Sequence, residues 1–231
     1  MINAESAKFL DLGQKVIKDR KMSKKDALVV LSRLPRTGHV KKRLSREIGE
    51  KDAREVFDNL FLRCLKEMSR LGVDLYLYLD SLPSQNKLMR EPWGGLVRKF
   101  HVRRQEGNDL GERIKHAFKE TFLNGAKNVV LVGSDVPGLK SGHVIEAFQG
   151  LSKGFDMALG PCIDGGYYLV ALKASLNGWE ALFDHICWGT SSVMDETTSR
   201  IDALGLRCLF LDTLFDIDTL DDLILWKGQG G

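Results

Sequence analysis

Short apolar runs alternate along this chain with longer stretches that follow the spacing of a helix. The run NVVLVGSD, residues 128–135, is the clearest strand, and ALVVLS, residues 27–32, is of the kind buried in a parallel sheet. Alternation of this sort predicts an α/β sandwich with a mostly parallel central sheet. Further strands are expected at 73–80, 96–102, 156–161, 167–172 and 206–212, and helices at 50–71, 110–124, 143–151, 191–205 and 218–226.

The 231 residues show no internal repeat, low-complexity tract or long linker, which favours one domain. Loosely helical spacing predicts an N-terminal helical extension over residues 1–25, followed by the domain at 26–231. Residues 80–92 are expected to form a surface loop. No apolar run approaches the roughly 20 residues that span a bilayer, and the N-terminus lacks the central apolar block of a secretory signal.

Charge and cysteine content narrow the function classes. A net charge of +3 is too small to indicate nucleic-acid binding by itself. The basic stretch at 15–46 is a solvated surface or, beside a glycine loop, a phosphate-binding surface; it lacks the interleaved aromatic residues or known module of an RNA-binding protein. The four cysteines are widely spaced without a C-x-x-C pair, which indicates reduced thiols and a cytoplasmic protein.

Ligands of open α/β sheets bind beyond the carboxyl ends of the strands, so the loops there are the candidate sites. The loop at 33–44, after the first strand, combines Gly38 with several cations and leads into a helix. It can form an anion cradle from backbone N–H groups, or it is a basic surface loop. It matches neither the P-loop nor the dinucleotide fingerprint.

Carboxylates follow two of the predicted strands. Asp135 comes directly after the clearest strand and is the first-choice ligand for Mg²⁺ or Mn²⁺; alternatively it closes a turn or caps the helix that begins near Ser141. Asp216 and Asp218 precede a helix, so one is a candidate N-cap and the other is free to face the metal.

Two other loops carry polar groups next to glycine. The stretch GPCIDGGYYLV, residues 160–170, holds Asp164 either in a tight turn or in a substrate pocket. The stretch QEGNDLGER, residues 105–113, contacts a nucleobase or ribose through Gln105 and backbone groups, or it is only a helix entry capped by Asp109.

Taken together, these loops resemble a bacterial glycosyltransferase-like family related to nucleotide-diphospho-sugar transferases, which includes the arsenosugar-biosynthesis type. The resemblance covers residues 27 to 226 and six motifs in order: PRTGHVKKRL (35–44), QEGNDLGER (105–113), GSDVP (133–137), GPCIDGGYYL (160–169), WGTS (188–191) and DIDT (216–219).

The resemblance implies a Rossmann-like α/β/α sandwich of the glycosyltransferase-A type. It further implies that Asp135 and Asp218 hold Mg²⁺ or Mn²⁺. The chain departs from the family pattern at Thr37, Lys42 and Gly138, where the family has proline, threonine and often an acid. The implied nucleotide-binding residues are Gly38, Lys41, Arg43, Gln105, Gly111 and Arg113, and the implied acceptor-binding residues are Gly165, Gly166, Trp188 and Thr190.

The function expected on these grounds is metal-dependent transfer of a sugar from a nucleotide-activated donor to a small-molecule acceptor. Asp164 would orient or deprotonate the acceptor hydroxyl, and Asp135 is the second predicted catalytic residue. One alternative is nucleotidyl transfer from an NTP to a phosphorylated acceptor. Another is a non-catalytic nucleotide-binding module, of which Lys42 and Gly138 would be signs. No nucleic-acid partner is expected.

Overall fold

The computed structural model describes residues 23, 25–36 and 40–228. The predicted helical extension at residues 1–25, apart from residues 23 and 25, and the predicted phosphate-loop residue Gly38 therefore lie outside the described residues. Within those residues, no helix is long and apolar enough to cross a membrane.

A seven-stranded sheet forms the centre of the described chain, in the order β3-β2-β1-β4-β6-β5-β7. The first four strands in chain order are mutually parallel, β7 is parallel to β5, and β6 is antiparallel to both of its neighbours. The predicted mixed α/β fold with a mostly parallel sheet is confirmed. The strands are β1 (Asp26–Ser32), β2 (Asp74–Leu79), β3 (His101–Arg104), β4 (Asn128–Gly133), β5 (Met157–Pro161), β6 (Tyr167–Lys173) and β7 (Cys208–Phe210).

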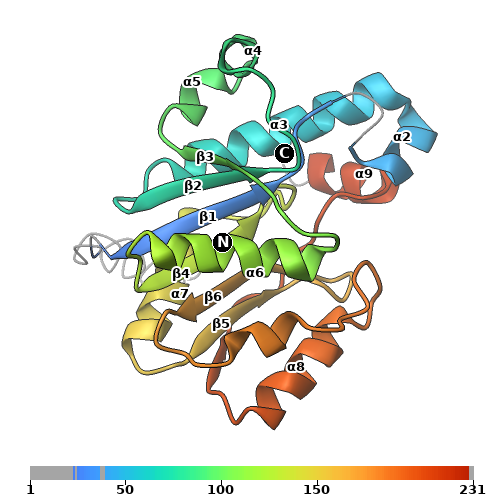
Figure 1. The fold of residues 1–231 in the computed structure, drawn as a ribbon. Helices are drawn as coiled ribbons and strands as arrows, with labels where there is room; N and C mark the ends of the chain where they lie inside the picture. Colours follow the sequence, from blue (N-terminus) through green and yellow to red (C-terminus); the bar gives the residue numbers. More distant parts are fainter. Residues whose placement is uncertain (1–22, 24, 37–39, 229–231) are drawn as a thin grey trace, which may run out of the picture.

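Helices cover both faces of this sheet (Figure 1). Leu28 and Val30 point to the face covered by α3 and α7, whereas Val29 points to the face covered by α6 and α8. Since neighbouring residues of a strand point to opposite faces, a strand buried on both sides must be apolar throughout, as β1 is. The helices are α2 (Lys42–Ile48), α3 (Glu50–Met68), α4 (Gln85–Arg90), α5 (Gly94–Val97), α6 (Leu110–Leu123), α7 (Ser141–Ser152), α8 (Val193–Ala203) and α9 (Leu220–Gly228), with a short 3₁₀ helix, η1 (Trp179–Phe183).

The segment between β2 and β3 differs from the prediction. Residues 80–92, expected to be a loop, contain α4; the first two residues of the strand expected at 96–102 belong to α5, and β3 begins only at His101. Trp93 explains the difference because its side chain is only 1% exposed and packs edge-on against Phe61 of α3, with ring centroids 5.1 Å apart. Packing against α3 therefore decides this segment, whose local sequence pattern is weak.

A third apolar cluster joins α9 and the segment before it to helices α2 and α3. Ile217 is fully buried beside Leu44 of α2 and Leu60 of α3. Figure 1 shows α9 next to α2 at the edge of the fold where β1 ends. The buried Ile217 therefore fixes the position of the two aspartates that flank it, Asp216 and Asp218.

Candidate functional site

The order of the strands reverses between β1 and β4. The chain moves outward from β1 to β2 and β3, and then returns to place β4 on the other side of β1. At the carboxyl ends of these two strands, the hydroxyl oxygens of Ser32 and Ser134 lie 2.6 Å apart and are buried. Such a reversal opens a crevice between the loops that leave the two strands, and this crevice is the usual ligand site of an open α/β sheet.

A buried lysine connects the loops at this crevice. The Lys41 side chain is 3% exposed, and its Nζ donates to Asp135 Oδ2 at 2.8 Å and to Asp218 Oδ1 at 3.2 Å. Lys41 adopts the left-handed conformation, with φ 46°, directly before α2. This conformation costs a non-glycine residue about 1–2 kcal/mol, so the contacts of the ammonium offset local strain.

The start of α9 leaves the Asp218 carboxylate available for this contact. The Asp222 carboxylate accepts hydrogen bonds from the backbone N–H groups of Asp218 and Thr219, at 3.0 and 2.8 Å. The Thr219 hydroxyl in turn accepts from the Asp222 N–H at 3.3 Å, which makes a reciprocal cap. Thr219 and Asp222 thus cap the helix, and Asp218, one of the two N-cap candidates of the sequence, does not.

Opposing effects set the charge state of this cluster. Burial disfavours the charged form of Lys41, but the nearby Asp135 and Asp218 carboxylates outweigh it and raise the lysine's pKa. Burial likewise opposes ionisation of Asp135, and the Lys41 ammonium reverses this and holds the pKa of that carboxyl below its usual range. The pKa of Asp216 is raised to about 6, mainly by burial and also by neighbouring carboxylates, among which is that of Asp164.

The donor atoms at this position fit a hard divalent cation. Two carboxylate oxygens from separate loops, those of Asp135 and Asp218, converge on one cationic nitrogen. Mg²⁺ and Mn²⁺ prefer one or two protein carboxylates together with substrate phosphate oxygens and water. No group of three or more His, Cys, Asp or Glu side chains that could hold a metal ion occurs among the described residues.

Arg43 lies at the outer edge of the same cluster. Its guanidinium is 3.9 Å from the Asp218 carboxylate and its side chain is 71% exposed. Lys41 therefore contacts both Asp135 and Asp218, as the resemblance implies for one site, and the exposed Arg43 lies near Asp218.

The Asp164 loop adopts the tight turn that its sequence allows. The Asp164 carboxylate accepts a hydrogen bond from the Gly166 N–H at 2.9 Å, and the Asp164 residue is exposed. Gly165 has φ 88°, and a Cβ at this position would lie 2.2 Å from the Ser191 carbonyl oxygen. The turn role of Asp164 and the need for glycine at 165 thus have a direct structural cause. The catalytic and acceptor-binding roles stay predictions.

The predicted acceptor residues Trp188 and Thr190 lie on the loop that contacts this turn. The Thr190 hydroxyl donates to the Cys187 carbonyl at 2.7 Å, and the Trp188 ring packs edge-on to Tyr167 at 6.2 Å. Gly111 approaches the same tryptophan, because a Cβ on Gly111 would meet Trp188 Nε1 at 2.8 Å. Gly111 is therefore buried against this loop.

A cavity of about 370 Å³ lies beyond the ends of β2 and β3. Gln105, predicted to lie near a nucleobase, lines it, and its Nε2 donates to the carbonyls of Ser32 at 2.7 Å and Tyr78 at 3.0 Å. These bonds tie the cavity to the carboxyl end of β1. Arg113 also lines it and donates to the Gly107 carbonyl at 3.1 Å. The full lining is Asp80, Arg104, Gln105, Glu106, Gly107 and Arg113.

Asp80 and Arg104 also line this cavity, although the sequence alone did not indicate them as site residues. Asp80 directly follows β2 and Arg104 ends β3, so the rule that drew attention to Asp135 applies to them too. Asp80 also accepts a hydrogen bond from the Leu34 N–H at 2.8 Å, which fixes the start of the loop after β1.

Comparison with known proteins places the chain in a family. Residues 65–190 match DUF2064, described as an uncharacterized protein conserved in bacteria. The chain belongs to this family. No protein with a curated description matches it.

Solved structures share the fold over nearly the whole chain. A "putative nucleotide-diphospho-sugar transferase" from Desulfovibrio desulfuricans G20 is 30% identical, with a TM-score of 0.81 over 90% of this chain and 88% of that one. A 4-diphosphocytidyl-2C-methyl-D-erythritol synthase is 13% identical, with a TM-score of 0.58 over 91% of this chain and all of that one. A mannosyltransferase from Pyrobaculum calidifontis, in complex with GDP-Man and Mn²⁺, is 10% identical, with a TM-score of 0.52 over 96% and 67%.

These structural neighbours are glycosyltransferase-like and nucleotidyltransferase enzymes, the two enzyme classes that the sequence predicts. The mixed α/β fold is that of glycosyltransferase-A-like nucleotide-diphospho-sugar transferases and cytidylyltransferases. The narrower likeness to the arsenosugar-biosynthesis type is not among these findings.

Proposed function

We propose that this protein is a metal-dependent transferase that moves a sugar from a nucleoside-diphosphate donor to a small-molecule acceptor. The observation that carries the proposal is the convergence of Lys41, Asp135 and Asp218 at the carboxyl ends of β1 and β4. The 30% identical relative described as a nucleotide-diphospho-sugar transferase supports the choice of reaction.

The phosphate end of the donor would lie at this cluster. Asp135 and Asp218 would hold Mg²⁺ or Mn²⁺, which supplies positive charge to the leaving diphosphate when bound. A neighbour of the same fold is described in complex with Mn²⁺. Lys41 and the exposed Arg43 add two cations at the same place, where stabilisation of developing phosphate charge is usually the largest catalytic contribution.

The nucleoside end would enter the cavity beside Gln105. Its volume of about 370 Å³ is within the range of small-molecule sites, and its lining includes Arg104 and Arg113. Gln105 uses its amide nitrogen to bond the carbonyls of Ser32 and Tyr78, which leaves its side-chain oxygen as an acceptor for a base or ribose donor.

The acceptor would approach from the loop of Asp164. This carboxylate is exposed, and it contributes to the raised pKa of Asp216 at the edge of the cluster. It would orient or deprotonate an acceptor hydroxyl, with Trp188 and Thr190 of the adjacent loop beside the acceptor.

Nucleotidyl transfer from an NTP to a phosphorylated acceptor is the second candidate. Both reactions build negative charge on a leaving phosphate, so the same cations serve either one. The synthase neighbour, which the chain matches over that protein's whole length, favours this candidate.

A non-catalytic nucleotide-binding module would bind nucleotide with an affinity that neither Mn²⁺ nor Asp135→Asn changes. The four free thiols support a cytoplasmic location.

Product analysis separates the two reactions. The protein is incubated with Mn²⁺ and radiolabelled UDP-, GDP- or ADP-sugars, and separately with NTPs and sugar phosphates. Sugar transfer predicts release of a nucleoside diphosphate that depends on Mn²⁺ and on Asp135. Release of pyrophosphate from an NTP, with no turnover of any nucleotide sugar, would replace the first candidate with the second.

A further inference from the structure

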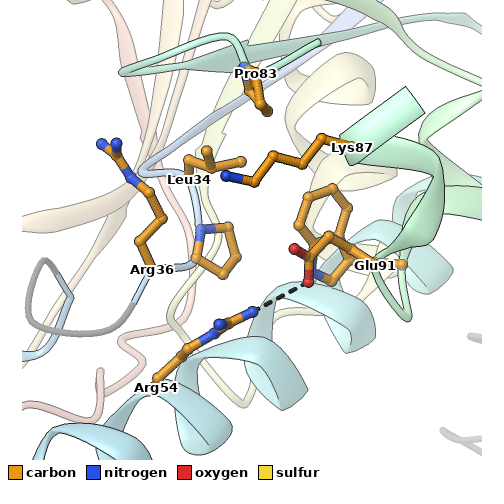
Figure 2. A pocket seen from close by; sticks show the side chains of 8 residues that line it. Leu34, Arg36, Arg54, Pro83, Lys87 and Glu91 are labelled. Carbon is orange, nitrogen blue, oxygen red and sulfur yellow. Dashed lines mark hydrogen bonds and ion pairs between the residues drawn. The ribbon is translucent and has the colours of Figure 1, made fainter. Parts of the chain in front are cut away.

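A second, smaller cavity lies on another side of the segment that follows β1. It measures about 100 Å³ and shares no lining residue with the cavity at Gln105. Figure 2 shows its walls, which come from this segment, from α3 and from the insertion between β2 and β3. The lining residues are Leu34, Pro35, Arg36, Arg54, Pro83, Lys87, Glu91 and Trp93.

Arg54 is the one cation of this lining that is fully paired. Its guanidinium lies 3.1 Å from Glu91 and 3.2 Å from Asp58. Glu91 is the only carboxylate in the lining, and its ion pair with Arg54 already uses it. This pair therefore leaves the other two cations of the cavity without a carboxylate inside it.

Arg36 and Lys87 have no carboxylate partner within this lining. The Arg36 side chain is 42% exposed and its guanidinium forms an ion pair with Asp80, outside the lining, at 4.0 Å, whereas its Nε is buried and has no hydrogen-bond partner among the described residues. The Lys87 side chain is exposed. Lys87 forms no ion pair with any carboxylate of the described chain, and Figure 2 shows its ammonium directed from α4 toward Leu34. A buried donor without an acceptor is costly, so an acceptor at this position is expected.

We propose that this cavity binds a phosphate group, either free or as the end of a small phosphate ester. Its oxygens would accept from the Arg36 Nε and from the Lys87 ammonium. A volume of about 100 Å³ admits such a group and excludes a nucleotide. Leu34, Pro35 and Trp93 form the apolar part of its wall.

This site is separate from the proposed catalytic cluster but is connected to it through the chain. Leu34, Pro35 and Arg36 line the cavity, and five residues after Arg36 comes Lys41. Occupancy would therefore fix the start of the loop that carries the catalytic lysine. The inference does not depend on which transfer reaction the protein performs.

Protection of individual lysines from acetylation tests the proposal site by site. The full chain is labelled at low ionic strength with and without inorganic phosphate, and the modification of Lys87 and Lys99 is followed by mass spectrometry. Lys99 is an exposed lysine of the same insertion that lines neither cavity. We expect phosphate to slow labelling of Lys87 severalfold and to leave Lys99 unchanged. Equal rates at Lys87 with and without phosphate would overturn the site.

Calorimetry with variants gives an independent readout. Arg36→Gln should weaken phosphate binding about tenfold, and so should Lys87→Gln, whereas Lys99→Gln should not alter it. Equal affinity in all four proteins contradicts the proposal. Glycerol 3-phosphate in place of phosphate identifies the source: stronger protection of Lys87 by the ester indicates a phosphate ester, stronger protection by phosphate indicates the free ion, and protection by neither rejects the site.

Discussion

The two parts of the proposed donor site differ in how much of their chemistry is already satisfied. At the ends of β1 and β4, Lys41 is buried and bonded to Asp135 and Asp218, so the charges are held in place by direct contacts. At the ends of β2 and β3, about 370 Å³ is open around Gln105. A preorganised charged cluster suits the reacting phosphates, whereas an open polar cavity suits recognition of the nucleoside.

The largest effect is expected from Asp135→Asn, which tests the charged cluster. The substitution removes the charge of the proposed metal ligand and the 2.8 Å ion pair with Lys41 at constant size. Transfer activity should fall by about 10²–10³, the usual cost of losing one preorganised electrostatic contact. The matched control is Asp202→Asn on the exposed end of α8. Activity within twofold of wild type in both variants would remove Asp135 from the catalytic machinery.

Lys41→Met tests whether the same cluster also stabilises the fold. The change removes the ammonium that contacts both carboxylates, next to a strained backbone, and leaves Asp218 with only the exposed Arg43 at 3.9 Å. Breaking a buried pair typically costs 3–5 kcal/mol, and partial exposure of both aspartates reduces this to about 2–3 kcal/mol of unfolding free energy. Urea unfolding measures it, with the exposed neighbour Lys42→Met as control. Equal losses in the two variants would show that the ion pairs are not the cause.

Gln105→Ala tests the open part of the site. It removes the two hydrogen bonds that join the cavity to β1 and β2, for a stability loss of about 1 kcal/mol. Nucleotide affinity, measured by calorimetry, should fall about tenfold, while binding of inorganic pyrophosphate should not change. A parallel loss for pyrophosphate would place Gln105 at the phosphate end instead.

The smallest expected effect is the pH-dependent contribution of Glu196 to stability at the loop of Trp188. Glu196 accepts from the Ser192 hydroxyl at 2.6 Å and the Cys187 N–H at 3.0 Å, and these bonds hold the pKa of Glu196 below its usual range. Its stabilising contribution is therefore complete above the ordinary glutamate pKa of 4.5 and is lost as the pH falls through the lower, folded-state value.

The melting temperatures of wild type and Glu196→Gln should accordingly differ at pH 7 and converge below pH 4.5. A difference that stays constant across this range would mean that ionisation of Glu196 has no part in holding the loop.

The strands were predictable where burial makes them apolar, and less so elsewhere. Residues 27–32 and 128–133 are apolar on both faces because helices cover both, and the predicted strands there agree with β1 and β4. By contrast, α4 and α5 exist because Trp93 and Leu88 pack against α3, a contact that no local pattern encodes. The antiparallel direction of β6 likewise depends on its neighbours.

The sequence predicts which residues belong to the candidate site, but it does not predict the contacts between them. Lys41, Asp135 and Asp218 each follow from the rule about strand ends or from the family resemblance, yet they lie 94 and 177 residues apart along the chain. Only the fold shows that the lysine contacts both carboxylates. The lining of the cavity in Figure 2 combines residues from three separate segments, so no motif indicates it.

We expect the crevice between β1 and β4 to bind a nucleotide together with a divalent cation through Asp218. Thermal unfolding of wild type and Asp218→Asn with nucleotides and nucleotide sugars, with and without Mn²⁺, measures this binding. The control is the exposed Asp221→Asn in the first turn of α9. At about 100 times its dissociation constant, a ligand should stabilise wild type and the control by about 2.7 kcal/mol, only with Mn²⁺, and stabilise Asp218→Asn much less. Stabilisation that is equal with and without Mn²⁺, or unchanged in Asp218→Asn, would contradict the account.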